Sequence, residues 1–130
     1  MDAFAAPSQA RKVLVVEDEP TLAENIGTYL EAMGHEVRIV GDGSSAIALC
    51  GDFAPDLLVL DYSLSDMSGF EVLDAMRRCS CLCECVLITA HPGEKVRHAA
   101  NARGILHILF KPFALADLAR LVRCVPAGCS

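Results

Sequence analysis

The chain has 130 residues, of which 53% are hydrophobic and 22% are charged, and its formal net charge is −6 with a pI near 5.1. This length favours a single globular domain, and the composition excludes an intrinsically disordered chain. The acidic balance argues against nucleic-acid binding through this domain, because phosphate backbones are bound by clustered Lys and Arg. We therefore expect a protein partner or a cation.

Residues 1–11 lack the basic start and the continuous apolar stretch of a signal peptide, and no apolar run approaches membrane-spanning length. We expect a cytoplasmic location without membrane contact, and a flexible leader over residues 1–11. The seven cysteines are then interpreted as thiols, because stable disulfides are rare in a reducing compartment.

Hydrophobic periodicity predicts five strands that alternate with five helices. In chain order we expect a strand at 12–17, a helix from Pro20 that stops at Gly34, a strand at 36–40, a helix at 45–50 punctuated by Gly51, a strand ending at Asp61, a helix at 70–78, a strand at 85–89, a helix at 94–103 closed by Gly104, a strand at 105–110 and a helix at 114–125. Strict alternation indicates an α/β domain over residues 12–125, with a five-stranded parallel sheet and helices on both faces. Residues 126–130 form a short tail, and the pattern leaves the strand order open.

Four of the predicted strands end in polar or charged residues: Glu17 with Asp18, Asp61, Thr89 and Lys111. Taken alone, Asp18 is more simply a solvated loop residue or helix cap, Lys111 a surface charge and Thr89 a residue of good β propensity. Parallel strands, however, bring their carboxyl ends to one edge of the sheet, where α/β proteins bind ligands. Three converging carboxylates would repel one another, and a hard divalent cation such as Mg²⁺ removes that repulsion.

Four sequence segments surround these residues. They are V-V-E-D-E-P after the first strand, L-D-Y-S-L-S-D-M-S-G-F-E-V-L around the third, L-I-T-A after the fourth and K-P-F after the fifth. As an ordered set they resemble the receiver domain of bacterial two-component response regulators, including the chemotaxis regulator. The resemblance covers nearly the whole chain and implies a flavodoxin-like (βα)5 fold.

The resemblance also implies a metal-assisted phosphoacceptor site. Asp61 would receive a phosphoryl group from a phosphohistidine on a sensor histidine kinase or a histidine phosphotransferase. Asp18, Asp61 and the backbone carbonyl of Ser63 would ligate Mg²⁺, and Glu17, which replaces the commoner aspartate, would act mainly through water. The chain would thus be a regulatory phosphoacceptor, with intrinsic self-phosphorylation and autodephosphorylation, rather than an enzyme.

Thr89 and Lys111 would each hold one phosphoryl oxygen, and the Lys111-Pro112 peptide would be cis, as in the family. Phosphorylation would then change a protein-binding surface made by the fourth helix, the fifth strand and the fifth helix, through which receivers also dimerise. The sequence does not identify the downstream target.

Several positions depart from the family pattern or fall in its variable loops. Ile108 stands where an aromatic residue usually precedes the lysine by three positions, so we expect output through Thr89 and its loop without an aromatic rotamer switch. Asp66 and Gly69 are expected to shape the loop before the third helix, Asp66 by capping and Gly69 by backbone freedom. His91 either influences water access to the phosphoryl group or is an ordinary exposed loop histidine.

The cysteines at positions 79, 81, 83 and 85 alternate along the connection before the fourth strand. Thiolates so spaced could bind Zn²⁺ or Cu(I), but the segment matches an ordinary loop, adjoins no histidine, and should direct Cys85 into the core. A metal or redox role is therefore the less favoured interpretation. Cys50 and Cys124 are expected to be packing residues.

Two rival functions stay open. A haloacid-dehalogenase-type phosphatase also uses an aspartyl nucleophile, but it requires a second acid two residues later, where this chain has Ser63. A scaffold receiver would keep the fold without becoming phosphorylated, and the intact set of site residues argues against it. Within the receiver family, the short tail mildly favours a complete single-domain regulator over a receiver cut from a longer protein.

Overall fold

The computed structural model describes residues 10–91 and 93–125. In chain order its elements are β1 (Lys12–Val16), α1 (Pro20–Ala32), β2 (Glu36–Val40), α2 (Gly43–Phe53), β3 (Leu57–Asp61), α3 (Gly69–Arg78), β4 (Glu84–Thr89), α4 (Glu94–Ala102), β5 (His107–Phe110) and α5 (Leu115–Cys124). The predicted α/β alternation is confirmed. Most of the predicted leader and the tail at 126–130 lie outside the described residues, whereas Arg11, the residue before β1, is buried.

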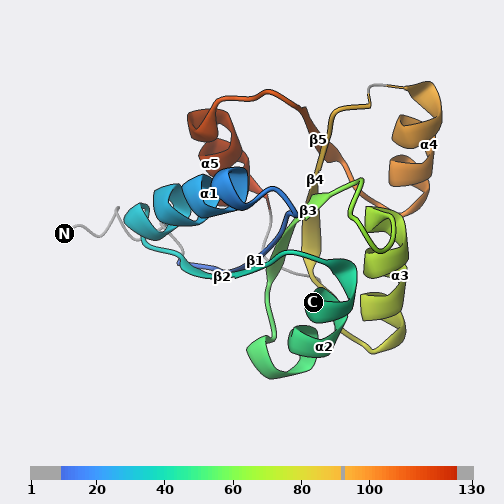
Figure 1. Ribbon diagram of the computed structural model, residues 1–130, viewed down its shortest axis with the longest axis horizontal. Helices are drawn as coiled ribbons and strands as arrows, with labels where there is room; N and C mark the ends of the chain where they lie inside the picture. Colours follow the sequence, from blue (N-terminus) through green and yellow to red (C-terminus); the bar gives the residue numbers. More distant parts are fainter. Residues whose placement is uncertain (1–9, 92, 126–130) are drawn as a thin grey trace.

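All five strands are parallel, and their order in the sheet is β2-β1-β3-β4-β5. The chain therefore builds outward from β1 to β2 in one direction, then returns to β3 and continues to β4 and β5 in the other. Helices α1 and α5 cover one face of the sheet, and α2, α3 and α4 cover the opposite face (Figure 1). The carboxyl ends of β1 and β3 flank the point where the order reverses, which is where ligands bind in open α/β sheets.

Alternate strand residues face the two helical layers, because successive side chains of a strand point to opposite sides of the sheet. Leu58 and Leu60 pack into one apolar cluster with α2 and α3, whereas Leu57 and Val59 pack into a second cluster with α1 and α5. Burial on both faces explains why the central strands read as continuous apolar runs.

The second helix is longer than predicted. It spans Gly43–Phe53, because the Asp42 side chain accepts a hydrogen bond from Ser45 N and starts the helix two residues earlier. Gly51 lies inside the helix instead of ending it, and Ala54 closes the helix in the left-handed region at φ 52°. The sequence interpretation gave too much weight to Gly51, which is exposed, because a single glycine costs a helix only about 1 kcal/mol.

The fifth strand is shorter than predicted and begins at His107. Gly104 adopts φ +78°, and Ile105 N donates to Ala100 O at 2.9 Å, so these two residues still terminate α4. Cys124 also differs from its prediction: it is exposed on α5, because Val122 and Val125 occupy the inward face. Cys50 and Cys85 are buried, as predicted.

Among the helices that the structure describes, none combines the length and the apolar character that a membrane span requires.

Candidate functional site

The carboxyl edge of the sheet gathers the acidic residues singled out in the sequence. Glu17 and Asp18 follow β1, and Asp61 is the last residue of β3, the strand beside it. One carboxylate oxygen from each of the three lies within 4.8 Å of the others. Glu17 and Asp61 are buried, whereas Asp18 is exposed, so the group opens to solvent on one side.

Lys111 places its ammonium between two of these acids. Its Nζ lies 3.0 Å from Glu17 Oε1 and 3.1 Å from Asp61 Oδ2. Lys111 N also donates to Thr89 O at 2.9 Å, which ties the end of β5 to the end of β4. The Lys111-Pro112 peptide is cis, as the resemblance implied.

The acidic group carries more carboxyl groups than nearby positive charges. Burial, together with the nearby Asp61 carboxylate, raises the pKa of Glu17 to about 7 despite hydrogen bonds from Glu19 N and Lys111. Burial alone would lower the pKa of Lys111, but its hydrogen bonds to Glu17 and Asp61 raise it above the usual lysine value. Lys111 pairs with Glu17 and Asp61, whereas Asp18 adds a third carboxylate to the group, so one ammonium stands against three carboxyl groups and an additional cation would be favourable.

The backbone at Gly69 passes very close to the backbone of Asp61 and Tyr62. A Cβ atom added to Gly69 would lie 2.6 Å from Asp61 O, and Gly69 N donates to Tyr62 O at 2.7 Å. Gly69 does not adopt a positive φ, so the expectation of backbone freedom is wrong; the residue is needed because the chain passes too close for a side chain. Ser63 N donates to Asp61 Oδ1 at 3.1 Å and orients the carboxylate.

Thr89 ends β4 and is fully buried. Its Oγ1 accepts a hydrogen bond from His91 N at 2.9 Å, so the hydroxyl is tied to the first residues of the β4–α4 connection. His91 itself is exposed, and its ring meets the edge of the Tyr62 ring with centroids 6.0 Å apart. The His91 imidazole thus contacts Tyr62, the residue after Asp61.

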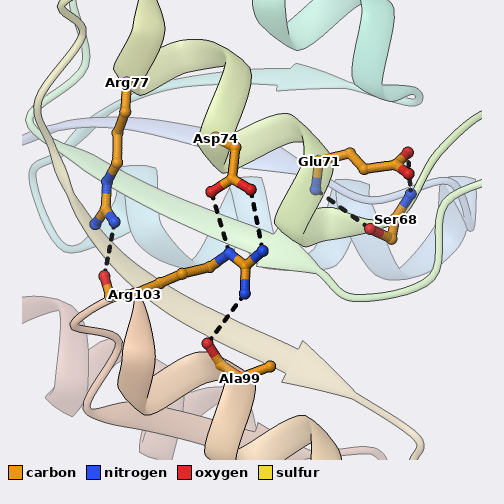
Figure 2. Close-up of polar contacts among 6 residues, drawn as sticks. All are labelled: Ser68, Glu71, Asp74, Arg77, Ala99 and Arg103. Carbon is orange, nitrogen blue, oxygen red and sulfur yellow. Dashed lines mark hydrogen bonds and ion pairs between the residues drawn. The ribbon is translucent and has the colours of Figure 1, made fainter.

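Asp66 caps a different helix from the one expected. Its carboxylate accepts hydrogen bonds from Gly43 N at 2.9 Å and Ser44 N at 3.0 Å, which lie at the start of α2. These bonds hold the pKa of Asp66 below its usual value. Helix α3 is capped instead by Ser68, whose side chain accepts from Glu71 N while Glu71 returns a bond to Ser68 N (Figure 2).

Comparison with known proteins identifies the family of this chain. The model of the response regulator receiver domain matches residues 13–123. This chain belongs to the response regulator receiver family. Among curated relatives, it is 38% identical over 120 residues to the probable transcriptional regulatory protein TcrX of Mycobacterium tuberculosis, and 32% identical over 113 residues to the DNA-binding response regulator MtrA of Mycolicibacterium smegmatis. These matches cover 92% and 87% of the chain and 51% and 49% of the relatives, so the receiver spans about half the length of each.

Solved receiver structures superpose closely on this one. The chemotaxis protein CheY4 of Vibrio cholerae has a TM-score of 0.84 at 26% identity, covering 91% of this chain and all of the other. The signal receiver domain of a LuxO-type repressor protein from Vibrio parahaemolyticus has a TM-score of 0.81 at 29% identity, covering 88% of each chain. The chain is thus a regulatory receiver domain of two-component signalling, with the fold that the sequence predicted.

One residue of this receiver escaped the sequence interpretation. Ile108 is half-buried and packs into the same apolar cluster as α2 and α3, so an aliphatic side chain fills that position. Two residues later, Phe110 is the register partner of Thr89 and lies on the same face of β5 as Ile108. Its ring is 37% exposed and receives the Arg97 guanidinium of α4 at 5.6 Å from the centroid. The alternation of strand side chains, which puts Phe110 on the same face as Ile108, is the sequence signal that could have identified it.

Proposed function

We propose that this receiver is switched by Mg²⁺-dependent phosphorylation of Asp61, with a phosphohistidine of a sensor histidine kinase or a histidine phosphotransferase as the donor. The supporting observation is the position of the Asp61 carboxylate, which lies 3.1 Å from Lys111 Nζ and within 4.8 Å of the acid pair. A carboxylate oxygen attacks phosphorus, the new O–P bond forms as the P–N bond of the donor breaks, and the electron pair remains on the donor imidazole. Such a transfer depends mostly on positioning and charge neutralisation.

The neighbouring side chains have separate tasks in this proposal. Lys111 already pairs with Asp61 and is positioned to follow the negative charge onto a phosphoryl oxygen. Thr89 offers a hydroxyl donor whose orientation is set by the hydrogen bond from His91 N. The exposed His91 ring, which contacts Tyr62 beside Asp61, would influence the access of water to the phosphoryl group.

The donor set fits a divalent oxygen-binding cation. Asp18 and Asp61, with the Ser63 carbonyl, would hold Mg²⁺, and Glu17 would contact it through water. The pKa of Glu17 is raised mainly by burial and further by Asp61, so a nearby cation would favour the ionised form of this carboxyl group. When bound, the ion supplies charge neutralisation between the acids and the incoming phosphoryl oxygens.

The surface of α4, β5 and α5 is the proposed output. Phosphorylation at Asp61 would bias the Thr89 loop, which leads directly into α4. A downstream protein, or a second copy of the chain, would recognise the altered surface. The acidic balance of the domain gives no support for direct nucleic-acid contact, and a cytoplasmic setting remains part of this proposal.

The deciding experiment is incubation with Mg²⁺ and acetyl phosphate, followed by intact-mass measurement. We expect a phosphate-sized gain in the native chain, no gain in Asp61→Asn, and a normal gain in Asp52→Asn, a matched exposed acid on α2. Persistent absence of the gain in the native chain would favour a scaffold receiver. A gain retained in Asp61→Asn would overturn the assignment of the nucleophile.

The pKa of Glu17 tests the cation site separately. Because this carboxyl has a raised pKa in the fold, its favourable protonated state stabilises the protein at low pH, and that contribution is lost as pH rises from about 4.5 to about 7. We expect thermal stability without metal to fall over this range in the native chain and to fall less in Glu17→Gln. Added Mg²⁺ should recover more stability at pH 8 than at pH 5, and an equal recovery at both would contradict the site.

A further inference from the structure

Four cysteines meet at the end of the sheet opposite the acidic site. Cys50 lies in the last turn of α2, Cys79 follows α3, and Cys81 and Cys83 continue toward β4. Cys50, Cys79 and Cys81 line one surface pocket together with backbone from both segments. The fold thus joins a cysteine from a distant helix to the alternating run, which local sequence could not show.

The central contact is between Cys81 and Cys50. Cys81 Sγ donates to Cys50 O at 3.9 Å, and the Cys50 thiol, which is near enough to raise the pKa of Cys81, donates to Ile47 O at 3.1 Å. The Cys81 thiol contacts Cys83 on its other side, because alternate residues of an extended segment share a face. Exposure decreases along the run, from exposed Cys79 through half-buried Cys81 to buried Cys83.

The geometry distinguishes between possible metals. Within residues 10–91 and 93–125, the acidic residues at the sheet edge form the only group of three or more ligand atoms that all lie within 4.8 Å of one another. The thiols therefore do not form the preassembled set of three or four ligands that Zn²⁺ requires. A soft cation that accepts two thiolates fits this pair, and among the metals that thiolates favour, Cu(I) is the monovalent one.

We propose that Cys50 and Cys81 form a binding site for one thiophilic monovalent cation of the Cu(I) type. Binding follows Cu⁺ + 2 RSH → [Cu(SR)2]⁻ + 2 H⁺, so each thiol releases its proton and no electron is transferred. The complex carries one negative charge, and Arg77 supplies positive charge close to the neighbouring Cys83 and Cys85. The cation would cross-link the end of α2 to the α3–β4 connection.

Oxidation is a weaker explanation for the same pair. Burial and the adjacent Cys50 raise the pKa of Cys81 to about 11, so little thiolate is present at neutral pH to attack an oxidant. A cation that binds sulfur strongly displaces the proton directly, which makes its affinity increase with pH.

The test uses the reduced full chain under anaerobic conditions, with Cu(I) supplied from a coloured chelator. We expect the native protein to remove one Cu(I) per chain, and Cys81→Ser to lose at least about tenfold in affinity, since even outer contacts of metal sites are worth about that much. Cys50→Ala should lose affinity for Cu(I) by a similar factor. Cys124→Ser, which replaces an exposed cysteine on α5, should bind Cu(I) as the native chain does. X-ray absorption should report two sulfur ligands.

Several results would overturn the site. Equal uptake by Cys81→Ser and Cys124→Ser would show that binding is not at this pair, and absence of uptake by the native chain would refute it outright. A spectrum with four sulfur ligands, or tighter binding of Zn²⁺ at the same thiols, would contradict the two-coordinate assignment. Phosphorylation of Asp61 should be intact in Cys81→Ser, so failure here is distinguishable from failure of the phosphoacceptor proposal.

Discussion

Helices α3 and α4 lie on the same face of the sheet, yet they are held by different forces. Helix α3 buries five residues, among them Phe70, Leu73 and Met76, and begins with a capping box. Helix α4 buries only Ala100, and Gly93 provides no side chain to cap its start. Apolar packing therefore fixes α3, whereas α4 has little buried surface to hold it in one position.

Polar contacts take the place of that packing for α4. Arg103, the residue after α4, forms two hydrogen bonds to Asp74 of α3 at 3.0 and 3.1 Å and a third to Ala99 O (Figure 2). Its guanidinium also lies 4.5 Å from the Phe70 ring centroid, and Arg77 donates to its carbonyl oxygen at 2.7 Å. Partly exposed ion pairs of this kind contribute little energy, so we expect α4 to move at a lower cost in free energy than α3.

The largest expected effect is in the α3 core. Leu73→Ala should lower the free energy of unfolding by about 2–5 kcal/mol, because it leaves a cavity at a fully buried position. Denaturant unfolding measures the change. Val96→Ala, at a half-buried position of α4, should cost less than half as much. Equal losses would show that α4 is packed as firmly as α3.

The next effect is at the start of α3. Ser68→Ala removes the acceptor of the hydrogen bond from Glu71 N and should cost about 1 kcal/mol in unfolding free energy. Glu71→Gln keeps an oxygen acceptor for Ser68 N and should stay close to the native value. If both variants lose the same amount, charge at the helix start matters more than the cap.

Replacing Arg103 should have a small effect on the free energy of unfolding and a larger effect on the local stability of α4. Because both side chains of the ion pair are partly exposed, Arg103→Ala should lower global stability by less than about 1 kcal/mol. Hydrogen exchange should nevertheless accelerate across α4 and remain unchanged in α3. Arg120→Ala, which breaks the exposed pair with Asp117 on α5, is the matched control and should leave α4 exchange unaltered. Uniform acceleration of both helices would contradict the comparison.

The smallest effect concerns the contact of α4 with β5. Arg97→Gln removes the guanidinium from the Phe110 ring and should cost about 0.5 kcal/mol, as exposed cation–π contacts do. Amide chemical shifts should change at the end of β5 and at Thr89, its register neighbour. Lys95→Gln, an exposed α4 substitution, should leave these shifts in place. Identical spectra for the two variants would exclude a link through Phe110.

The sequence interpretation succeeded where local pattern is sufficient and failed where the answer depends on distant neighbours. Hydrophobic patterning together with turn signals predicted every strand, and periodicity correctly placed Val72, Leu73 and Met76 on the inward face of α3. Asp66 was assigned to the wrong helix, because its partners at Gly43 and Ser44 are 23 and 22 residues away. No local periodicity encodes a contact of that kind.

The candidate site shows the same division. The sequence alone determined that acids, a hydroxyl and an ammonium follow apolar strands, since parallel strands ending in polar residues must present them at one edge. Only the tertiary structure decided the strand order that sets Glu17 beside Asp61, the close passage that requires Gly69, and the meeting of Cys50 with Cys81. These features depend on which elements become neighbours in the fold. The neighbours are determined by the packing of all the apolar faces together, and no single segment of the sequence contains that information.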